Sequence, residues 1–212
     1  MVLVELCCDA EVTKIVDSTI EKFGRLDVLV NCAGISERGT TETTSLDQYD
    51  SNMNVNVRAI YHLTMLCVPH LIETRGNIVN VSSLCGTRPL PKLLAYSMSK
   101  SAVNMMTNSI ALELAPKGVR VNSVNPGVVP ANLQQRGGLT GDAYDKTMEH
   151  FKEVHPLGRL GKPEEVAQAI AFLASSNASF ITGEQLHVYR RRIARGLRSL
   201  TLTLTPRDIK TT

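Results

Sequence analysis

The segment LDVLVNCAG, residues 26–34, is the stretch from which the fold can be worked out. It reads as an apolar strand that runs into a glycine turn. An apolar strand without regular polar alternation is buried on both of its faces, which is typical of parallel sheets. The segment therefore predicts an α/β protein, provided that helices alternate with similar strands on either side of it.

Such an alternation continues in both directions along the chain. On the amino-terminal side VLVEL (residues 2–6) reads as a short buried strand, and Asp9 can cap a helix that runs to Phe23 and ends at Gly24. On the other side, helices are expected at about 46–74, 95–115 and 163–175, an irregular or helical insert at 127–162, and strands at GNIVNV, GVRVNSV and GEQLHV. This order predicts a doubly wound parallel sheet with its ligand site at the carboxyl ends of the strands.

The composition is that of a globular domain of ordinary size, with 212 residues, 43% apolar and 20% charged. No apolar run reaches the roughly 18 residues of a membrane span, and the first residues lack the pattern of a signal peptide. The five cysteines are an odd number without metal-ligand spacing, so we expect reduced thiols, no metal site and a cytoplasmic location.

Basic residues are concentrated at the carboxyl-terminal end. Residues 189–212 contain seven Arg or Lys and one Asp, a net charge of +6 in a chain whose total is +3, so the first 188 residues carry −3. A basic tail can bind nucleic acid or anionic lipid, but nothing else in the chain supports this, and neither partner is expected. The alternating segment TLTLT could form a strand, although a solvated tail is favoured.

Tyr96 and Lys100 stand four residues apart in LLAYSMSKSAVNMM, residues 93–106. On a helix this spacing puts both side chains on one face, one turn apart. A nearby ammonium lowers the pKa of a phenol from its usual value of about 10, and such a phenol can exchange a proton with a reacting oxygen near neutral pH. A surface pair without a function would have the same spacing, so the neighbouring segments must decide.

Seven segments in a fixed order make the chain resemble the short-chain dehydrogenase/reductase family. They lie between Val2 and Val188: LDVLVNCAG, NVNVRAIY, GNIVNVSS, AYSMSKSAV, VRVNSVNPG, PLGRLGKPEEVAQAIAFLAS and ASFITGEQLHV. The resemblance implies a Rossmann-like domain in residues 1–188, followed by a divergent basic tail in residues 189–212. It also implies hydride transfer between NAD or NADP and a small-molecule carbonyl or alcohol.

The resemblance assigns catalytic roles to particular residues. Tyr96 is expected to be the general acid/base, and Lys100 to lower its pKa and bind the nicotinamide ribose. Ser83, thirteen residues before Tyr96, is expected to hold the substrate oxygen, with Ser82 as the adjacent alternative.

The resemblance extends to a proton relay and to the cofactor site. Asn56 is expected to anchor a water near the lysine, with Asn54 as the runner-up. Besides Tyr96 and Lys100, the residues expected to contact the cofactor are Asn31, Ala33, Gly34, Pro126, Gly127 and Val129.

Three features depart from the family pattern. The first glycine of the chain is Gly24 and no glycine-rich phosphate loop occurs, so we expect an N-terminally truncated domain that lacks the first βαβ segment and leaves the strand at 26–31 with an unpaired edge. Ala131 stands where the family usually has a Thr that binds the nicotinamide carboxamide. After Val188 the resemblance ends abruptly, as after a shifted reading frame or an alternative exon.

Two main hypotheses follow. The first is an NAD(P)-dependent oxidoreductase, whose substrate is shaped by residues 84–94 and 128–162 and is expected to be small or mid-sized and fairly apolar. The second is a catalytically impaired isoform that acts as an interaction protein through the helices at 46–74 and 95–115, by which family members usually form dimers or tetramers. A nucleic-acid or membrane binder that uses the tail is a third, less favoured hypothesis.

Overall fold

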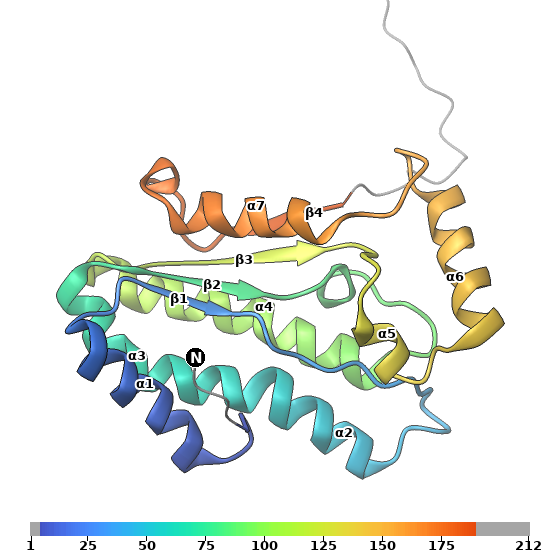
Figure 1. Ribbon diagram of the computed structural model, residues 1–212, viewed down its shortest axis with the longest axis horizontal. Coiled ribbons are helices and arrows are strands. Elements are labelled where there is room, and N and C mark those ends of the chain that lie inside the picture. The colour runs from blue at the N-terminus through green and yellow to red at the C-terminus, as the bar shows by residue number, and fades with distance from the viewer. Residues whose placement is uncertain (1–4, 190–212) are drawn as a thin grey trace, which may run out of the picture.

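The computed structural model describes residues 5–189, and the chain forms one parallel sheet of four strands within them. The strands are β1 (Val28–Asn31), β2 (Asn77–Val81), β3 (Arg120–Pro126) and β4 (Gln185–Val188), arranged side by side in chain order (Figure 1). The predicted α/β fold with a parallel sheet is confirmed. Of the predicted strand VLVEL, Glu5 and Leu6 are described and are not in a strand, and the remainder lies outside the described residues.

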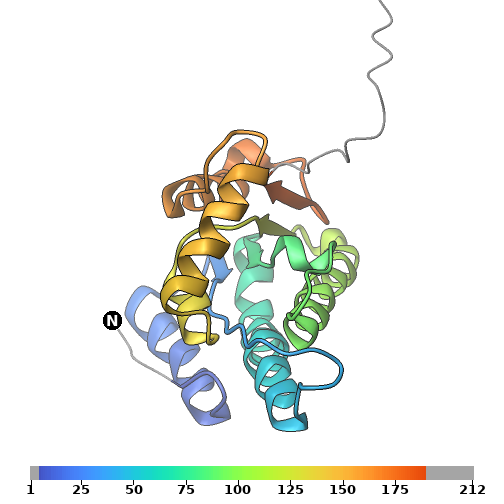
Figure 2. The ribbon, with the colours of Figure 1, turned by 90° about the vertical axis from the view of Figure 1, so that its right-hand side faces the viewer.

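Helices pack on both faces of the sheet (Figures 1 and 2). On one face lie α3 (Ala59–Thr74) and α4 (Leu94–Leu114), with α1 (Asp9–Phe23) packed against α3. On the other face lies α7 (Pro163–Ala174). Each strand divides its residues between the two sides, so that Ile78 and Val121 join the core under α3 and α4, whereas Val79 and Val124 pack with α7.

The cover on the α7 side stops short of β1. The helix α7 contacts β2, β3 and β4, and within residues 5–189 β1 pairs with β2 alone. Leu29 of β1 is buried toward α3, but Val28 and Val30, which point to the other side, are 37% and 40% exposed. The predicted unpaired edge is therefore present in the described part of the chain, and the predicted cover on both faces holds for the other three strands.

The predicted long helix over residues 46–74 is present but is not uniform. It consists of α2 (Leu46–Met53), a π-helical segment η1 (Asn54–Arg58) and α3. A π-helical segment inserts an extra residue into a helical turn and changes the direction in which the side chains around it point. Here the π-helical segment contains Asn56, whose side chain is fully buried although the helix around it is only partly buried.

The start of α1 corrects one prediction. Asp9 does not cap the helix, because Cys8 occupies the N-cap position and provides no side-chain hydrogen bond. The carboxylate of Asp9 instead accepts two 2.8 Å hydrogen bonds from the guanidinium of Arg58, which joins α1 to η1. The end of the helix is as predicted, since Gly24 adopts a left-handed φ of 70° that a glycine takes without steric cost.

The insert over residues 127–162 contains two helices, α5 (Asn132–Arg136) and α6 (Gly141–Val154). Figure 2 looks onto the carboxyl ends of the strands, and both helices stand in front of the sheet there. Three short 3-10 turns complete the described elements: Leu84–Gly86, Ala115–Lys117 and Ser176–Ala178. The insert therefore lies where a parallel sheet places its ligand.

The five cysteines are all free thiols in the structure, as expected for reduced cysteines. No helix among the described residues combines the length and the apolar character that crossing a bilayer requires. The basic tail and the TLTLT segment lie outside the described residues.

The start of α2 provides a test of local stability. The Ser45 Oγ accepts a 3.1 Å hydrogen bond from the Gln48 N–H, and Gln48 Oε1 accepts one from the Ser45 N–H, which forms a capping box. Ser45→Ala should lower the free energy of unfolding by about 1 kcal/mol in urea denaturation. The matched variant Ser109→Ala loses an exposed hydrogen bond to a backbone carbonyl within α4, and it should change the free energy of unfolding by less than about 0.5 kcal/mol. Equal effects of the two variants would contradict the capping role.

Candidate active site

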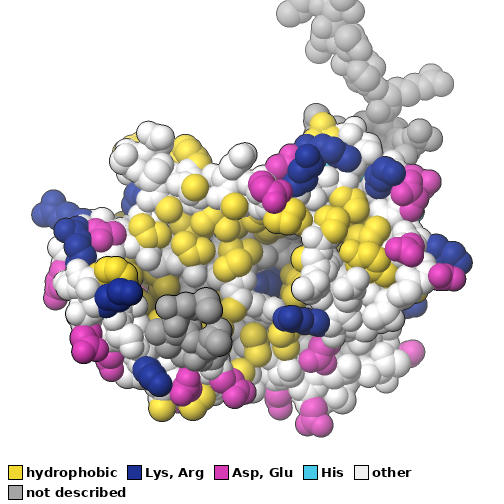
Figure 3. Space-filling model, viewed as in Figure 1, with side chains coloured by type: hydrophobic (Ala, Val, Ile, Leu, Met, Phe, Trp, Pro, Cys, Tyr) yellow, Lys and Arg dark blue, Asp and Glu magenta, His cyan; other side chains and the backbone are white. Residues whose placement is uncertain are grey.

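Two adjoining cavities open at the carboxyl ends of the strands. One, which we call the apolar cavity, has a volume of about 200 Å³ and is enclosed by the turn after β2, the start of α4, α5 and α6. The other, which we call the groove, has a volume of about 410 Å³ and runs from Cys32 and Gly34 after β1 toward Val166 and Ile170 of α7. Figure 3, which views the molecule from the same side as Figure 1, shows that side hollowed near its centre, with apolar side chains gathered along the hollow below α7.

Ser83, Tyr96 and Gly127 line both cavities. Ser83 lies two residues after the end of β2, Tyr96 lies in the first turn of α4, and Gly127 directly follows β3, so the single crossover from β2 through α4 to β3 brings them together. Leu133 and Gln134 of α5 also line both cavities, so a molecule in the apolar cavity and one in the groove would meet at these five residues. The sequence separation of thirteen between Ser83 and Tyr96 thus corresponds to proximity in space.

The two neighbouring serines differ in what their hydroxyls do. The Ser82 hydroxyl is buried and donates a 3.1 Å hydrogen bond to the Lys100 carbonyl in α4, so it fastens the helix to the sheet. The Ser83 hydroxyl accepts a 3.1 Å bond from the Cys85 N–H, which leaves its own proton free for another acceptor. Ser83 is therefore the better placed of the two to bind an oxygen at the boundary of the cavities.

Lys100 is buried below the groove, with 3% of its surface exposed. Its ammonium donates a 2.9 Å hydrogen bond to the Val81 carbonyl at the end of β2. The Nζ atom lies 5.8 Å from the centroid of the Tyr96 ring, one helical turn away, as the spacing of four residues predicts.

The predicted lowering of the Tyr96 pKa is wrong for the protein without ligands. Burial raises the pKa of Tyr96 to about 12, and a hydrogen-bonding contact with Ser83 offsets only part of that rise. Burial likewise lowers the pKa of Lys100 to about 8. The prediction considered the neighbouring ammonium and not the burial of the pair, whereas removing both groups from water disfavours both charges. Tyr96 is therefore a neutral phenol near pH 7, which is the form that can donate a proton.

Asn56 fixes the loop that follows β1. Its Oδ1 accepts a 2.8 Å hydrogen bond from the Ile35 N–H, and its Nδ2 donates to the Ile35 carbonyl at 2.9 Å and to the Ser99 hydroxyl at 3.0 Å. The backbone of Gly34 passes so close that an added Cβ would lie 3.1 Å from Asn56 Oδ1 and 3.3 Å from Lys100 Nζ. Asn54, the alternative, is exposed beside Asp9 and lines neither cavity.

The residues predicted to contact the cofactor divide into two groups. Six of them line the groove: Gly34, Tyr96, Lys100, Pro126, Gly127 and Val129. Asn31 and Ala33 do not line it. The amide of Asn31 is buried, and it donates to Asn80 Oδ1 at 2.8 Å and to the Thr64 hydroxyl at 3.2 Å. Ala131, the residue that replaces the family threonine, does line the groove.

A pair of buried amides behind Ser83 was not identified from the sequence. Asn125 donates to the Ser83 carbonyl at 3.3 Å and to Asn104 Oδ1 at 3.1 Å. Gly86 permits this arrangement, since an added Cβ would lie 2.6 Å from Asn104 Nδ2. Asn104 stands one turn beyond Lys100 and two beyond Tyr96, so helical spacing alone could have indicated it.

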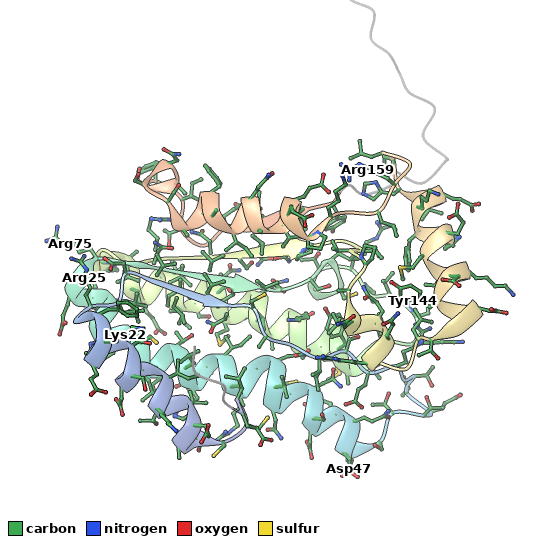
Figure 4. All side chains as sticks on the ribbon, in the orientation of Figure 1. Lys22, Arg25, Asp47, Arg75, Tyr144 and Arg159 are labelled. Carbon is green, nitrogen blue, oxygen red and sulfur yellow. The ribbon has the colours of Figure 1, made fainter. Side chains whose placement is uncertain are left out.

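The residues that shape the apolar cavity were predicted only in part. Cys85 lies in the segment 84–94, and Met148 and Phe151 of α6 lie in the segment 128–162, both of which were expected to shape the substrate site. Arg38, which also lines the cavity, was missed. The position of Arg38 in a loop that follows the carboxyl end of a strand could have indicated it. Two other arginines, Arg25 and Arg75, which are labelled in Figure 4, lie at the opposite end of the sheet. Among residues 5–189, no group of three or more His, Cys, Asp or Glu is arranged to hold a metal ion.

Comparison with known sequences gives consistent matches. The family model described as Enoyl-(Acyl carrier protein) reductase matches residues 2–189. The 3-oxoacyl-[acyl-carrier-protein] reductase of Thermotoga maritima is 38% identical over 179 residues, which are 84% of this chain and 70% of that protein. The L-fucose dehydrogenase of Bos taurus is 38% identical over 188 residues, 86% of this chain and 69% of that protein.

Solved structures of similar architecture give the same result. An aldohexose dehydrogenase of Thermoplasma acidophilum in ligand-free form has a TM-score of 0.81 at 35% identity, covering 88% of this chain and 75% of its own. A 3-ketoacyl-(acyl-carrier-protein) reductase of Brucella melitensis complexed with NADH also has a TM-score of 0.81, at 34% identity, covering 89% of this chain and 76% of its own.

Proposed function

Since the chain belongs to the short-chain dehydrogenase/reductase family of NAD(P)-dependent oxidoreductases, we propose that it transfers hydride between NAD or NADP and a small-molecule carbonyl or alcohol. The observation that carries this proposal is the position of Ser83 and Tyr96 on the boundary of two cavities. A cofactor in the groove and a substrate in the apolar cavity would have their reacting atoms at the same two side chains.

The groove suits the nicotinamide end of a cofactor. It combines apolar side chains of Val129, Val166 and Ile170 with the Lys100 ammonium, and Gly34 leaves room above that ammonium. When bound, the nicotinamide supplies or accepts the hydride. Lys100 would hold the ribose hydroxyls, and Ala131 offers no side-chain donor to the carboxamide. The glycine-rich sequence that binds phosphates in relatives does not occur in these 212 residues.

The protein side chains would provide the proton transfer. In reduction, the Tyr96 hydroxyl donates its proton to the substrate oxygen while the Ser83 hydroxyl donates a hydrogen bond to the same oxygen and stabilises its developing negative charge. The neighbouring Lys100 ammonium stabilises the phenolate that remains. Asn56, which holds the Ile35 backbone beside Lys100, would anchor a water that returns a proton to Tyr96.

A second candidate function is association through α3 and α4. Large apolar side chains are exposed at spacings of four and seven residues along these helices: Tyr61, Met65, Met98, Met105 and Leu112. Such spacings place the residues of each helix on one face, and an exposed apolar face is a feature of protein interfaces. This face suits a homo-oligomer, a dimer or tetramer, whether or not the chain also catalyses a reaction.

Cofactor binding tests the first candidate. We expect titration of NADH or NADPH into the purified protein to raise nicotinamide fluorescence with saturation in the micromolar range. The double variant Tyr96→Phe, Lys100→Ala should weaken binding at least about tenfold, because it removes the buried ammonium from the groove. The matched variant Tyr61→Phe, Lys117→Ala changes exposed residues and should leave binding unaltered.

The outcomes separate the two candidates. Binding that the double variant weakens supports the oxidoreductase, and a screen of carbonyl substrates then follows. A folded protein that binds neither cofactor would rule out hydride transfer by this chain, and would leave association through α3 and α4 as the supported function.

A further inference from the structure

The apolar cavity contains one charged side chain, that of Arg38. Its described lining otherwise consists of apolar, small polar and amide residues, and neither it nor the groove is lined by Asp or Glu. A cation beside a largely apolar cavity without an acidic counterpart gives the cavity a positive potential, which an anion would neutralise.

Four of the eight arginines in residues 5–189 have a structural partner. Arg38 has none in this range, like Arg75, Arg88 and Arg136, but these three do not line the apolar cavity, whereas Arg38 does. Arg25, Arg58 and Arg159 each form an ion pair with a carboxylate, to Asp27, Asp9 and Glu165 respectively. Arg120 donates to three backbone carbonyls, those of Leu173, Ser175 and Ile181. In residues 5–189, no ion pair or side-chain hydrogen bond engages Arg38, and the adjacent Glu37 does not pair with it or line the cavity. A structural role for its guanidinium is therefore not apparent in the described part of the chain.

The backbone that carries Arg38 is held at both ends. At Ile35 it exchanges two hydrogen bonds with the Asn56 side chain. At Gly39 it accepts a bond from the Leu94 N–H and donates one to the Lys92 carbonyl, just before the helix that carries Tyr96. Between them, Ser36 contacts Gly137 so closely that an added Cβ would collide with the Ser36 carbonyl oxygen. The position of Arg38 is thus fixed relative to the proposed catalytic groups.

The remainder of the cavity selects for an apolar body. Leu93, Leu139, Met148 and Phe151 enclose it, and Leu139 and Met148 are buried. The volume of about 200 Å³ suits a molecule the size of a substituted benzene ring or a short chain. The carbonyl end of such a molecule would lie at Ser83 and Tyr96, which line the same cavity as Arg38.

We propose that the substrate is an apolar carbonyl or alcohol that also carries an anionic group, a carboxylate, sulfonate or phosphate, and that Arg38 pairs with this group. The proposal deepens the proposed function and rests on it. A guanidinium offers two parallel N–H donors to such an anion, and the low polarity of the surrounding side chains strengthens the pair. Arg38 is then a specificity-determining residue.

Binding of matched acids and esters tests this inference without requiring turnover. The probes are 4-formylbenzoate and 6-oxoheptanoate with their methyl esters, and their dissociation constants are measured by saturation-transfer NMR. We expect each acid to bind the full chain more tightly than its ester. Arg38→Gln should weaken binding of the better acid about tenfold and leave the ester unaltered. Arg136→Gln removes an exposed arginine that lines neither cavity and should change neither.

Equal affinities for acids and esters in the unmodified protein would overturn the inference, as would acid binding that Arg38→Gln does not weaken, or no acid binding at millimolar concentration. Unchanged ester binding by the variant shows that it is folded.

NADH and NADPH oxidation with the same probes is measured separately. Reduction of an ester without Arg38-dependent acid binding refutes the anionic substrate and keeps the proposed function. Arg38-dependent acid binding without cofactor binding refutes the proposed function and supports the anion site.

Discussion

Replacing Tyr96 by Phe is expected to lower kcat/KM for carbonyl reduction by about two to four orders of magnitude. The change removes one hydroxyl and keeps the ring, which is 7% exposed, so the surrounding packing is retained. Without the hydroxyl, the carbonyl oxygen loses its proton donor, and the hydrogen bond from Ser83 alone remains to stabilise the developing charge. Steady-state oxidation of NADH or NADPH gives the rates, and circular dichroism gives the fold.

Tyr61→Phe is the matched control, since Tyr61 is exposed on α3 and remote from both cavities. It should leave kcat/KM unaltered. A Tyr96→Phe variant that retains full kcat/KM would falsify the assignment of Tyr96 as the general acid. A loss that appears only in KM would instead show that the hydroxyl binds substrate without transferring a proton.

Replacing Lys100 by Met is expected to stabilise the fold at pH 7 by about 2 kcal/mol. The pKa of Lys100 falls from 10.5 to about 8 on burial, and at about 1.4 kcal/mol per pKa unit this shift corresponds to a cost of about 3 kcal/mol for keeping the ammonium charged. The lost hydrogen bond to the Val81 carbonyl offsets about 1 kcal/mol of the gain. Stability would then rise in the variant that loses the proposed function.

The pH dependence identifies the cause. Between pH 8 and 10.5 the unfolded chain binds more protons at Lys100 than the folded chain, so the stability of the unmodified protein should rise with pH through this window. The advantage of Lys100→Met should therefore shrink toward pH 10. At higher pH Tyr96 acts in the opposite direction: its pKa is raised from 10.0 to about 12, so the folded state keeps the extra proton and its stability falls as pH rises through that range.

Urea unfolding at pH 7, 8, 9 and 10 measures both effects. Lys117→Met, which changes an exposed lysine, should change the free energy of unfolding by a small amount that is nearly the same at all four pH values. A Lys100→Met variant that is less stable than the unmodified protein at pH 7 would show that the ammonium contributes more through its bond to Val81 than its burial costs.

The parts of the fold that depend on local pattern could be predicted from the sequence. The long helices at 46–74 and 95–115 and the strands at Val28–Asn31 and Asn77–Val81 follow from apolar runs bounded by turn residues. The π-helical segment at Asn54–Arg58 could not be predicted, because its extra residue is stabilised by the contacts of Asn56 with Ile35 and Ser99, which are far away in sequence. Asp9 was assigned to a cap for the same reason, since its partner Arg58 lies 49 residues away.

The candidate site divides along the same line. Spacing and resemblance were sufficient to nominate Ser83, Tyr96 and Lys100, and these remain predictions until rates are measured. The direction in which the Tyr96 pKa shifts could not be predicted from spacing or resemblance, because the shift depends on how far folding removes the phenol from water. Arg38 was not predicted, because it lies in a loop. Only in a helix or a strand does the periodicity of the sequence indicate which way a side chain points.

The two attachments of the loop after β1 also have an evolutionary consequence. The Asn56 side chain forms hydrogen bonds with the backbone of Ile35, and the backbone of residues 92–94 forms hydrogen bonds with the backbone of Gly39. The three residues between these anchors, 36–38, can therefore change identity without disturbing either the helix that carries Tyr96 or the one that carries Asn56. Selection or protein design could therefore vary the side chains of this segment, and with them the molecules that fit the apolar cavity, while both attachments stay the same.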